Sequence, residues 1–314
     1  MTAGAAARWH GRVTADFSIR PARPDDAAAA VALRASVYPY LVRGEASTRR
    51  MFASPPPGEE RIFLLAERDG AIVGNVSALR DVRSADPAFG RIGLHVHPDH
   101  RGRGVGTALL AEAVDHLRAV GVRRVATWVR PESVKFAGAH GFEKSREMRF
   151  SALDLTGFGD RTWVPAPPGI QLVRLREVTE QALYAADVAA ATDEPGDTPP
   201  QPTPYPLWRY ETLEEPGLDR DASTAAVAGG EIVSFSMVLR DGDRIWSDMT
   251  ATVPGHRGRG LARLVKTAAL RRAAASGVRT AYTSNDEENA PMLAVNERLG
   301  YRPVASQFSC LATL

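Results

Sequence analysis

Cysteine is nearly absent from this chain of 314 residues, which contains Cys310 and no other. A single thiol cannot close an internal disulfide or supply a cysteine metal cluster, so a disulfide scaffold is excluded and a reducing compartment is favoured. No apolar run approaches the roughly 18 residues that a membrane-spanning helix requires. Residues 1–16 contain no apolar core of the kind that a secretion signal carries. We therefore expect a cytoplasmic protein without a membrane partner, with Cys310 packed inside.

A strong charge of one sign is also missing. Lysine and arginine number 39 against 37 aspartates and glutamates, which leaves a formal charge of +2. So small an excess gives no field that would attract nucleic acid or anionic lipid. The 44% of hydrophobic and 24% of charged residues are typical of a globular protein. At roughly 150 residues a domain, the length predicts about two domains.

One pentapeptide occurs twice and decides the organisation. His100–Gly104 recurs as His256–Gly260, 156 positions further along the chain. A strand-like run that ends near a proline precedes each copy, at Ile92–Val96 and at Met249–Val253. An amphipathic helical pattern follows each copy. The chain is therefore predicted to contain one structural unit twice.

Matching segments surround both copies. Each half is predicted as strand, helix, hairpin, strand, helix, strand, helix, strand, with hairpin turns at Asp69-Gly70 and Gly229-Gly230. The fold class is mixed α/β, with a twisted mixed β-sheet flanked by helices in each half, and the two sheets are expected to pack or pair across the repeat. The predicted boundaries are a flexible N-terminal segment at 1–16, an N-terminal domain at 17–160, a linker at 161–169 and a C-terminal domain at 170–314.

A proline-rich stretch, Pro195–Pro206, interrupts the second half. It is either a polyproline ligand for a partner or a long loop over a binding cleft. The loop interpretation is preferred, and it makes Asp193–Trp208, with Tyr210 nearby, the candidate substrate lid.

The repeated turn has the composition of an anion site. Its two versions are Arg101-Gly102-Arg103-Gly104-Val105-Gly106 and Arg257-Gly258-Arg259-Gly260-Leu261-Ala262. Glycine lets a ligand approach the backbone, so successive N–H groups can point at one anion, and the following helix adds its positive N-terminal end. The turn therefore predicts a pyrophosphate cradle. A position between strand and helix argues against an RGG-type nucleic-acid segment, and the chain has neither a P-loop nor a Gly-x-Gly-x-x-Gly after its first strand.

These residues resemble the GNAT superfamily of N-acetyltransferases. The run Leu94–Gly106 is similar to the family motif Gln/Arg-x-x-Gly-x-Gly/Ala that follows a strand ending in Val-x-Pro, and Asn289–Tyr301 is similar to a later asparagine-bearing helix of the family. The resemblance extends from about Phe17 to Leu314 and favours tandem, two-domain members of the mycothiol synthase kind. It implies two tandem GNAT-like domains, each with a split between its fourth and fifth strands.

The resemblance also implies a cosubstrate, acetyl-CoA, bound in such a split, with no metal. Pantetheine would pair with strand backbone near Val96 or Thr252, and an amine would attack the thioester directly. The candidate residues for binding coenzyme A are Val96, Arg101, Gly102, Arg103, Gly104, Val105 and Gly106 in the first half, and Thr252, Val253, Arg257, Gly258, Arg259, Gly260, Leu261, Ala262 and Asn289 in the second.

Transfer to an amine needs a base. When the two strands are aligned on their prolines, Asp248 falls opposite Ile92, so an acid occurs there only in the second half. Asp248 shares one strand face with Thr250 and Thr252 by period-two geometry. It is the candidate catalytic base; a solvated strand-end aspartate is the alternative.

The usual leaving-group acid of the family is a tyrosine four residues before the Gly-aromatic pair. That position holds Ala137 in the first half and Asn296 in the second. Asn296 could donate a hydrogen bond to sulfur but no proton, which makes it a candidate catalytic residue of limited power. Asn289 matches a position that contacts the cofactor in the family, and it could equally cap its helix. The cluster Asn285–Glu288 could contact a cationic substrate or form a solvated loop.

Histidines suggest no further chemistry. His95 and His97 share a strand face without a third ligand at metal spacing, and His100 and His256 abut the turn, where packing or capping explains them. The sequence therefore predicts an enzyme, a monomer or homodimer, whose second half transfers an acetyl group from acetyl-CoA to a small-molecule amine. Two alternatives stay open: a non-catalytic acyl-CoA-binding or interaction protein, and catalysis in the N-terminal half.

Overall fold

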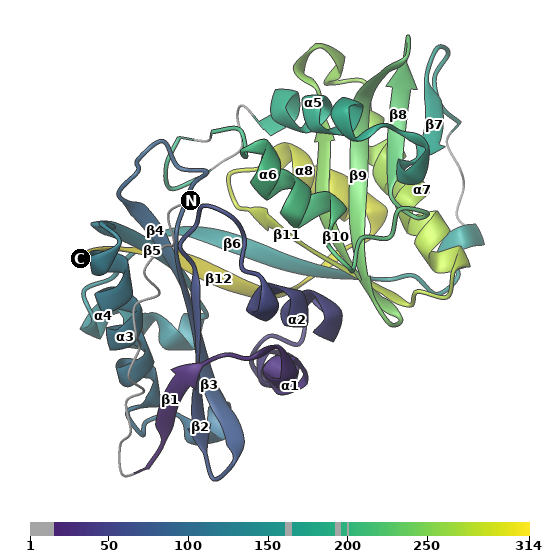
Figure 1. Ribbon diagram of the computed structural model, residues 1–314. Helices are drawn as coiled ribbons and strands as arrows, with labels where there is room; N and C mark the ends of the chain where they lie inside the picture. Colours follow the sequence, from purple (N-terminus) through teal and green to yellow (C-terminus); the bar gives the residue numbers. More distant parts are fainter. Residues whose placement is uncertain (1–15, 161–164, 192–195, 200) are drawn as a thin grey trace.

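The strands of both halves form one continuous sheet. The computed structural model describes residues 16–160, 165–191, 196–199 and 201–314 (Figure 1). Residues 1–15 and 161–164, most of the predicted N-terminal segment and part of the predicted linker, lie outside this part of the chain, as do 192–195 and 200 in the predicted lid. No helix within the described part is long and apolar enough to cross a membrane.

Each half contributes six strands, in the order that the sequence predicts. Those of the first half are β1 (Ser18–Pro21), β2 (Ile62–Arg68), β3 (Ala71–Arg80), β4 (Phe89–Val96), β5 (Arg124–Val129) and β6 (Glu143–Asp154). Those of the second half are β7 (Gln171–Arg174), β8 (Thr224–Ala228), β9 (Glu231–Asp241), β10 (Arg244–Thr252), β11 (Thr280–Asp286) and β12 (Arg302–Thr313).

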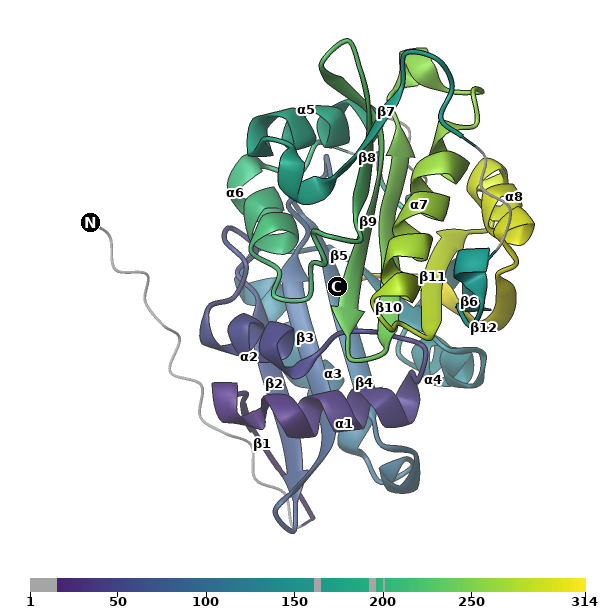
Figure 2. The ribbon, with the colours of Figure 1, turned by 90° about the vertical axis from the view of Figure 1, so that its right-hand side faces the viewer.

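The helices cover both faces of the sheet. They are α1 (Ala27–Val37), α2 (Glu45–Ala53), α3 (Val105–Ala119) and α4 (Val134–Ala139), then α5 (Glu180–Ala190), α6 (Tyr205–Trp208), α7 (Leu261–Ala275) and α8 (Ala290–Leu299). In the second half, α5 and α6 lie on one face and α7 and α8 on the other (Figure 2). Strand β9 is therefore covered on both faces, and most of its side chains are buried. The mixed α/β class is confirmed.

The predicted hairpin turns form where expected. Asp69 and Gly70 both have positive φ, 51° and 77°, as do Gly229 and Gly230 with 59° and 87°. Two successive left-handed residues match the twist of the flanking strands and close a two-residue hairpin. These turns connect β2 to β3 and β8 to β9.

The last strand of each half is exchanged. The strand order is β1-β2-β3-β4-β5-β12-β6-β11-β10-β9-β8-β7. Strand β12 pairs with β5 of the first half, from Phe308 opposite Val129 to Thr313 opposite Arg124. Strand β6 pairs with β11 of the second half, and β6 and β12 pair with each other at the centre (Figure 1). The two sheets are thus joined through crossed C-terminal strands. The predicted domain boundaries at 160 and 170 describe the order along the chain and stay a prediction.

Packing follows the same exchange. One core cluster of the first half is closed by Cys310 of β12, which is buried as expected, and one of the second half by Leu153 of β6. A third cluster joins Tyr38 and Tyr40 of the first half to Phe150 on β6 and to the partly buried Trp246 of β10. Each half therefore completes its apolar core with a strand from the other.

Candidate active site

Strands β10 and β11 separate where a bulge interrupts β10. Their parallel pairing ends at Trp246 and Tyr282. On the other side, the register with β9 shifts between Ser247 and Thr250, so that Asp248 and Met249 together oppose one residue of β9. A bulge of this kind bends a strand and re-aims its side chains. The split and the bulge thus occur at one place, and Asp248 is part of the bulge.

The first half has the split without the bulge. Strand β4 pairs with β3 without interruption from Gly90 to Val96. Ile92 stands opposite Thr127 and Ala78, and the residue with the equivalent register in β10 is Ser247. Alignment on the prolines had set Asp248 opposite Ile92. The sheet register differs by one because β10 contains one extra residue, and no residue of β4 corresponds to it.

A cavity of about 860 Å³ lies against the β10–β11 split and the second glycine turn; we call it the β10–β11 cavity. Gly258 and Gly260 have φ of 74° and 75°, in the left-handed region that favours glycine. A Cβ atom at either position would meet no heavy atom within 4 Å, so the turn leaves open space in front of its backbone. No side chain caps helix α7, which begins after Gly260. The N–H groups of its first turn are available to an anion.

The two turns are held in the same way. Arg257 donates a hydrogen bond from Nε to the carbonyl oxygen of Thr252 at 3.0 Å, and Arg101 donates likewise to Val96 at 3.3 Å. Each bond fastens the start of the turn to the end of the preceding strand. The repeat in sequence is therefore a repeat in three dimensions.

Most of the residues predicted to bind the cofactor line one of two cavities, the β10–β11 cavity or a cavity of the first half between β4 and β5, which we call the β4–β5 cavity. Those that line the β10–β11 cavity are Thr252, Arg257, Gly258, Gly260, Leu261, Ala262 and Asn289. Those that line the corresponding β4–β5 cavity are Val96, Arg101, Gly102, Gly104 and Gly106. Val253, Arg259, Arg103 and Val105 lie beside the turns and line neither cavity. The binding role of each residue stays a prediction.

A second cavity, of about 510 Å³, adjoins the first; we call it the cross-half cavity. Five residues line both cavities: Asp248, Met249, Ser284, Asn285 and Asn289. The cross-half cavity takes its walls from both halves, because Arg43, Arg61 and Arg83 of the first half line it together with Asp248 of the second. Asp248 therefore stands at the passage between two cavities.

The surroundings of Asp248 shift the pKa of its carboxyl. Its side chain is open to the cavities, yet protein surrounds the group, and this burial raises the pKa of its carboxyl above the ordinary value. A hydrogen bond from the Met249 backbone and the charge of Arg43 lower that pKa again, whereas Glu211 and Glu215 raise it. The net direction is upward, which is the direction expected of a carboxylate that acts as a general base.

Arg43 differs from the other arginines of the cross-half cavity. Arg83 pairs with Glu211 at 3.1 Å, and Arg61 pairs with the buried Glu59 at 2.7 Å. Arg43 donates to the sulfur of Met51 and pairs with no carboxylate in the described part of the chain. Its guanidinium group is therefore available to a ligand in the cavity.

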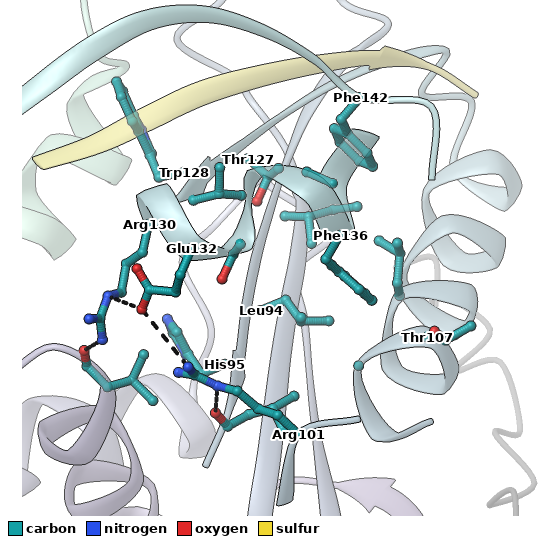
Figure 3. A pocket seen from close by; sticks show the side chains of 18 of the residues that line it. Leu94, His95, Arg101, Thr107, Thr127, Trp128, Arg130, Glu132, Phe136 and Phe142 are labelled. Carbon is teal, nitrogen blue, oxygen red and sulfur yellow. Dashed lines mark hydrogen bonds and ion pairs between the residues drawn. The ribbon is translucent and has the colours of Figure 1, made fainter. Parts of the chain in front are cut away.

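The β4–β5 cavity of the first half, about 460 Å³, is more apolar (Figure 3). The carboxylate of Glu132, which lines this cavity, forms ion pairs with Arg130 Nε at 2.8 Å and with Arg101 Nη1 at 3.9 Å. Burial lowers the pKa of His95 to about 4, and its Nδ1 lies 2.6 Å from Asn75 Oδ1. Tyr38 packs edge-on against the His95 ring, with 5.1 Å between ring centroids. The charged groups that line this cavity are thus paired, or neutral at physiological pH.

The side chains of Asn289 and Asn296 each make a hydrogen bond within the second half. The Asn289 side chain accepts a hydrogen bond from the Met292 backbone at 3.2 Å, so it caps helix α8 while it lines both cavities. Asn296 is buried, donates from Nδ2 to Asn285 Oδ1, and lines neither of the two cavities. A role for Asn296 at the leaving sulfur stays a prediction.

The described part of the predicted lid packs against the site. Trp208 and Tyr210 are buried and line the cross-half cavity. Asp197 accepts hydrogen bonds from Ser309 of β12 and Arg146 of β6, at 2.7 and 3.1 Å. The segment around Asp197 is therefore fastened to both exchanged strands.

Two groups of residues escaped sequence reasoning. Arg43, Arg61 and Arg83 reach the second-half site from the first half, across distances along the chain that no local motif reports. Lys266 lines the β10–β11 cavity and is 1% exposed. Its signal was present, because the 156-residue repeat sets this lysine opposite Leu110 on the apolar face of a helix. Within the described residues, no group of three or more potential ligands is arranged to hold a metal.

The fold and the cavities define a class of protein: a tandem structure with two split sheets, each with a cavity beside the split that is lined by a glycine turn. A model of the acetyltransferase (GNAT) family matches residues 31–142 and again residues 188–301. The chain therefore belongs to the acetyltransferase (GNAT) family, carries its domain twice, and is an acetyltransferase.

Individual relatives named acetyltransferases are similar to this chain over most of its length. The chain is 32% identical over 272 residues to a mycothiol acetyltransferase of Nocardiopsis dassonvillei, covering 78% of this chain and 80% of the relative. It is 29% identical over 274 residues to one of Saccharomonospora viridis, covering 80% and 84%. Among solved structures, a tandem GNAT protein from the clavulanic acid biosynthesis pathway matches with a TM-score of 0.74 at 22% identity, over 95% of this chain and 98% of the other. A GCN5-related N-acetyltransferase from Sphaerobacter thermophilus matches with a TM-score of 0.70 at 20% identity, over 96% and 97%.

Proposed function

We propose that the second half transfers an acetyl group from acetyl-CoA to the amine of a small molecule, with Asp248 as the general base. The observation that carries this proposal is the position of Asp248 where the β10–β11 cavity meets the cross-half cavity. A donor in the first cavity and an acceptor in the second would meet at this carboxylate. GNAT acetyltransferases generally use acetyl-CoA, which supports the choice of donor.

The β10–β11 cavity fits coenzyme A. The open turn at Gly258 and Gly260 and the uncapped start of α7 suit a pyrophosphate. Arg257, Arg263 and Arg298 line the same cavity and supply positive charge for phosphate groups. Strand β10 has no parallel partner beyond Trp246, and pantetheine amides would pair with its backbone on that side, where the Thr252 carbonyl oxygen already accepts from Arg257.

The cross-half cavity suits a polar amine. Asp248, Glu211 and Glu215 favour an ammonium group, and Asp248 would take its proton so that the free amine can attack. Arg43 would bind an oxygen-rich part of the same molecule. A volume of about 510 Å³ suits a small molecule. Because curated relatives are named mycothiol acetyltransferases, the amine that remains when mycothiol lacks its acetyl group is the first acceptor to test.

The test is acetyl transfer by the purified chain to a panel of small amines, followed by release of coenzyme A, together with calorimetric titration of coenzyme A. We expect binding to the second half and turnover with at least one amine. Binding without turnover on any member of the panel would favour the non-catalytic alternative. Absence of binding would remove the proposal.

A further inference from the structure

Three polar side chains are buried together beneath the β10–β11 split: Ser247, Lys266 and Tyr301. None is more than 3% exposed. The Lys266 nitrogen lies 5.1 Å from the centre of the Tyr301 ring, and the hydroxyl of Ser247 lies beside that of Tyr301. Within the described residues, both hydroxyls lack a hydrogen-bond partner of good geometry, and Lys266 makes no ion pair. Burial of polar groups without partners costs free energy, so this cluster needs an explanation.

The first half has apolar side chains at the three corresponding positions. Leu110 precedes Lys266 by the repeat distance of 156 residues, Ile92 has the sheet register of Ser247, and Phe142 follows the glycine that corresponds to Gly300. Ile92, Leu110 and Phe142 are all buried and all line the β4–β5 cavity. The fold therefore accepts apolar residues at these places. It therefore does not require polar residues here, and the polar cluster needs a functional explanation in the second half.

Lys266 faces the place where a thioester would lie. It lines the β10–β11 cavity with Asp248 and Thr283, and Thr283 donates a hydrogen bond to the Ser247 carbonyl oxygen at 3.0 Å, directly beyond the last parallel pair of the two strands. We propose that Lys266 contacts the sulfur of coenzyme A and protonates it as it leaves, a role that rests on the proposed function. The Tyr301 ring would position the ammonium group through a cation–π contact.

The step balances with groups that the chain contains. Asp248 first passes the proton of the ammonium group to water, and as a carboxylate it then accepts the second proton, which the nitrogen loses as it forms its bond to the carbonyl carbon. Lys266 gives a proton from Nζ to sulfur as the carbon–sulfur bond breaks and its electron pair passes to sulfur. Both side chains then return to their first protonation state by exchange with water. No oxidant, metal or further reactant is needed.

The surroundings of Lys266 suit an acid that works near neutral pH. Burial lowers its pKa to about 7, and burial is the cause that acts on it. Helix α7 packs against β8, β9, β10, α8 and the short helix Phe158–Asp160. The titratable groups that face the cavity from these elements and from α7 are Asp248, Arg298, Arg263 and Lys266 itself, and Tyr301 faces Lys266 from the start of β12.

The first experiment uses the small number of lysines. Lys135, Lys144 and Lys266 are the only ones, so protein labelled with ¹³C at lysine Cε gives three side-chain signals by NMR. We expect one signal to titrate with a midpoint of about 7 and to vanish in the Lys266→Leu variant. Coenzyme A should shift this midpoint upward, because a nearby thiolate favours the ammonium form, and desulfo-coenzyme A should not.

The second experiment measures affinity. At pH 8 the wild-type chain should bind coenzyme A about tenfold more tightly than desulfo-coenzyme A, the effect of a charge-assisted contact to sulfur. Lys266→Leu, which installs the residue of the first half, should bind both ligands alike. Lys135→Met changes an exposed lysine and should keep the wild-type preference. Lys266→Arg should keep the preference and lose turnover, since arginine holds its proton.

The outcomes separate the two proposals. A wild-type chain that binds neither ligand removes the proposed function and the role of Lys266 with it. Equal binding of the two ligands, or a lysine signal that neither ligand moves, leaves acetyl transfer intact and overturns the role of Lys266. The signal of the wild-type protein decides the question even where Lys266→Leu fails to fold.

Discussion

Gln307 on β12 donates a hydrogen bond from Nε2 to the hydroxyl of Tyr40 at 3.1 Å, and both side chains are buried. The contact joins the last strand of the chain to the segment between α1 and α2. Arg244 of β10 reaches the same segment and donates to the Pro39 carbonyl oxygen at 2.8 Å. The two halves therefore share their interiors as well as their sheet.

The first prediction concerns separation of the halves. A fragment of residues 16–160 loses β12, which pairs with β5, and a fragment of residues 165–314 loses β6, which pairs with β11. We expect each fragment alone to lack a cooperative thermal transition, because its core is open and its strand edges are unpaired. The two fragments expressed together should associate and recover that transition by circular dichroism. A first half that is monomeric and cooperatively folded by itself would contradict this.

The second prediction concerns Asp248. Replacement by asparagine keeps the shape and removes the base, so kcat should fall by roughly 10²- to 10⁴-fold, the usual contribution of general base catalysis. The affinity for coenzyme A should change little. The control is Glu132→Gln in the first half, whose carboxylate is paired with Arg130. Unchanged turnover in Asp248→Asn together with a loss in Glu132→Gln would argue for chemistry in the first half.

The third prediction concerns pH. The base works when deprotonated, so kcat/KM should rise with pH through the raised pKa of Asp248 and fall off below it. Arg43 holds that pKa down, so Arg43→Met should move the acidic limb of the profile to higher pH. Glu211 pushes the pKa up, so Glu211→Gln should move the limb to lower pH. Shifts in one direction for both variants would show that the limb belongs to another group.

The fourth prediction compares the two turns. Gly260→Glu puts a non-glycine residue at a φ of 75° and a carboxylate where a pyrophosphate would lie, so turnover should be lost. Gly104→Glu makes the same change at a φ of 80° in the first half and should leave turnover within about twofold, since the proposed base, Asp248, lies in the second half. Assays of both variants, with circular dichroism to verify folding, decide between the halves.

Sequence reasoning reached what is local or repeated. The glycine turns, the hairpins at Asp69-Gly70 and Gly229-Gly230, and the paired halves follow from residue type and spacing, because φ preference and hydrophobic period act over a few residues. The exchange of β6 and β12 was out of reach. The exchanged strands make contacts between residues far apart in sequence, such as Gln307 with Tyr40, and no local pattern reports such contacts.

The site was predicted in part for the same reason. Asp248 and the turn residues lie close to one another along β10 and α7, so a motif could point to them. The bulge adds one residue to β10, and no local sequence pattern indicates it. Alignment on the prolines therefore set Asp248 opposite Ile92, whereas Ser247 has that register in the sheet. Arg43 enters the cross-half cavity from the other half. Lys266 could not be recognised from sequence because its neighbours Leu264 and Val265 indicate an apolar helix face.

The last prediction concerns Asp197, whose side chain is fully buried between the exchanged strands. Burial by itself raises the pKa of this carboxyl, but hydrogen bonds from Ser309 and Arg146 outweigh it and hold the pKa below the ordinary value. A depressed carboxyl pKa contributes stability above the unfolded pKa of about 4, and this contribution is lost as pH falls through the folded value. Asp197→Asn should therefore lower the free energy of unfolding at pH 7 by about 1–3 kcal/mol, the cost of weakening a buried, charged hydrogen-bond network. Urea unfolding at pH 7 and near pH 3 measures it: the difference in the free energy of unfolding between the two proteins should be smaller near pH 3 than at pH 7. A difference that is equal at both pH values would mean that Asp197 acts through its shape and not through its charge.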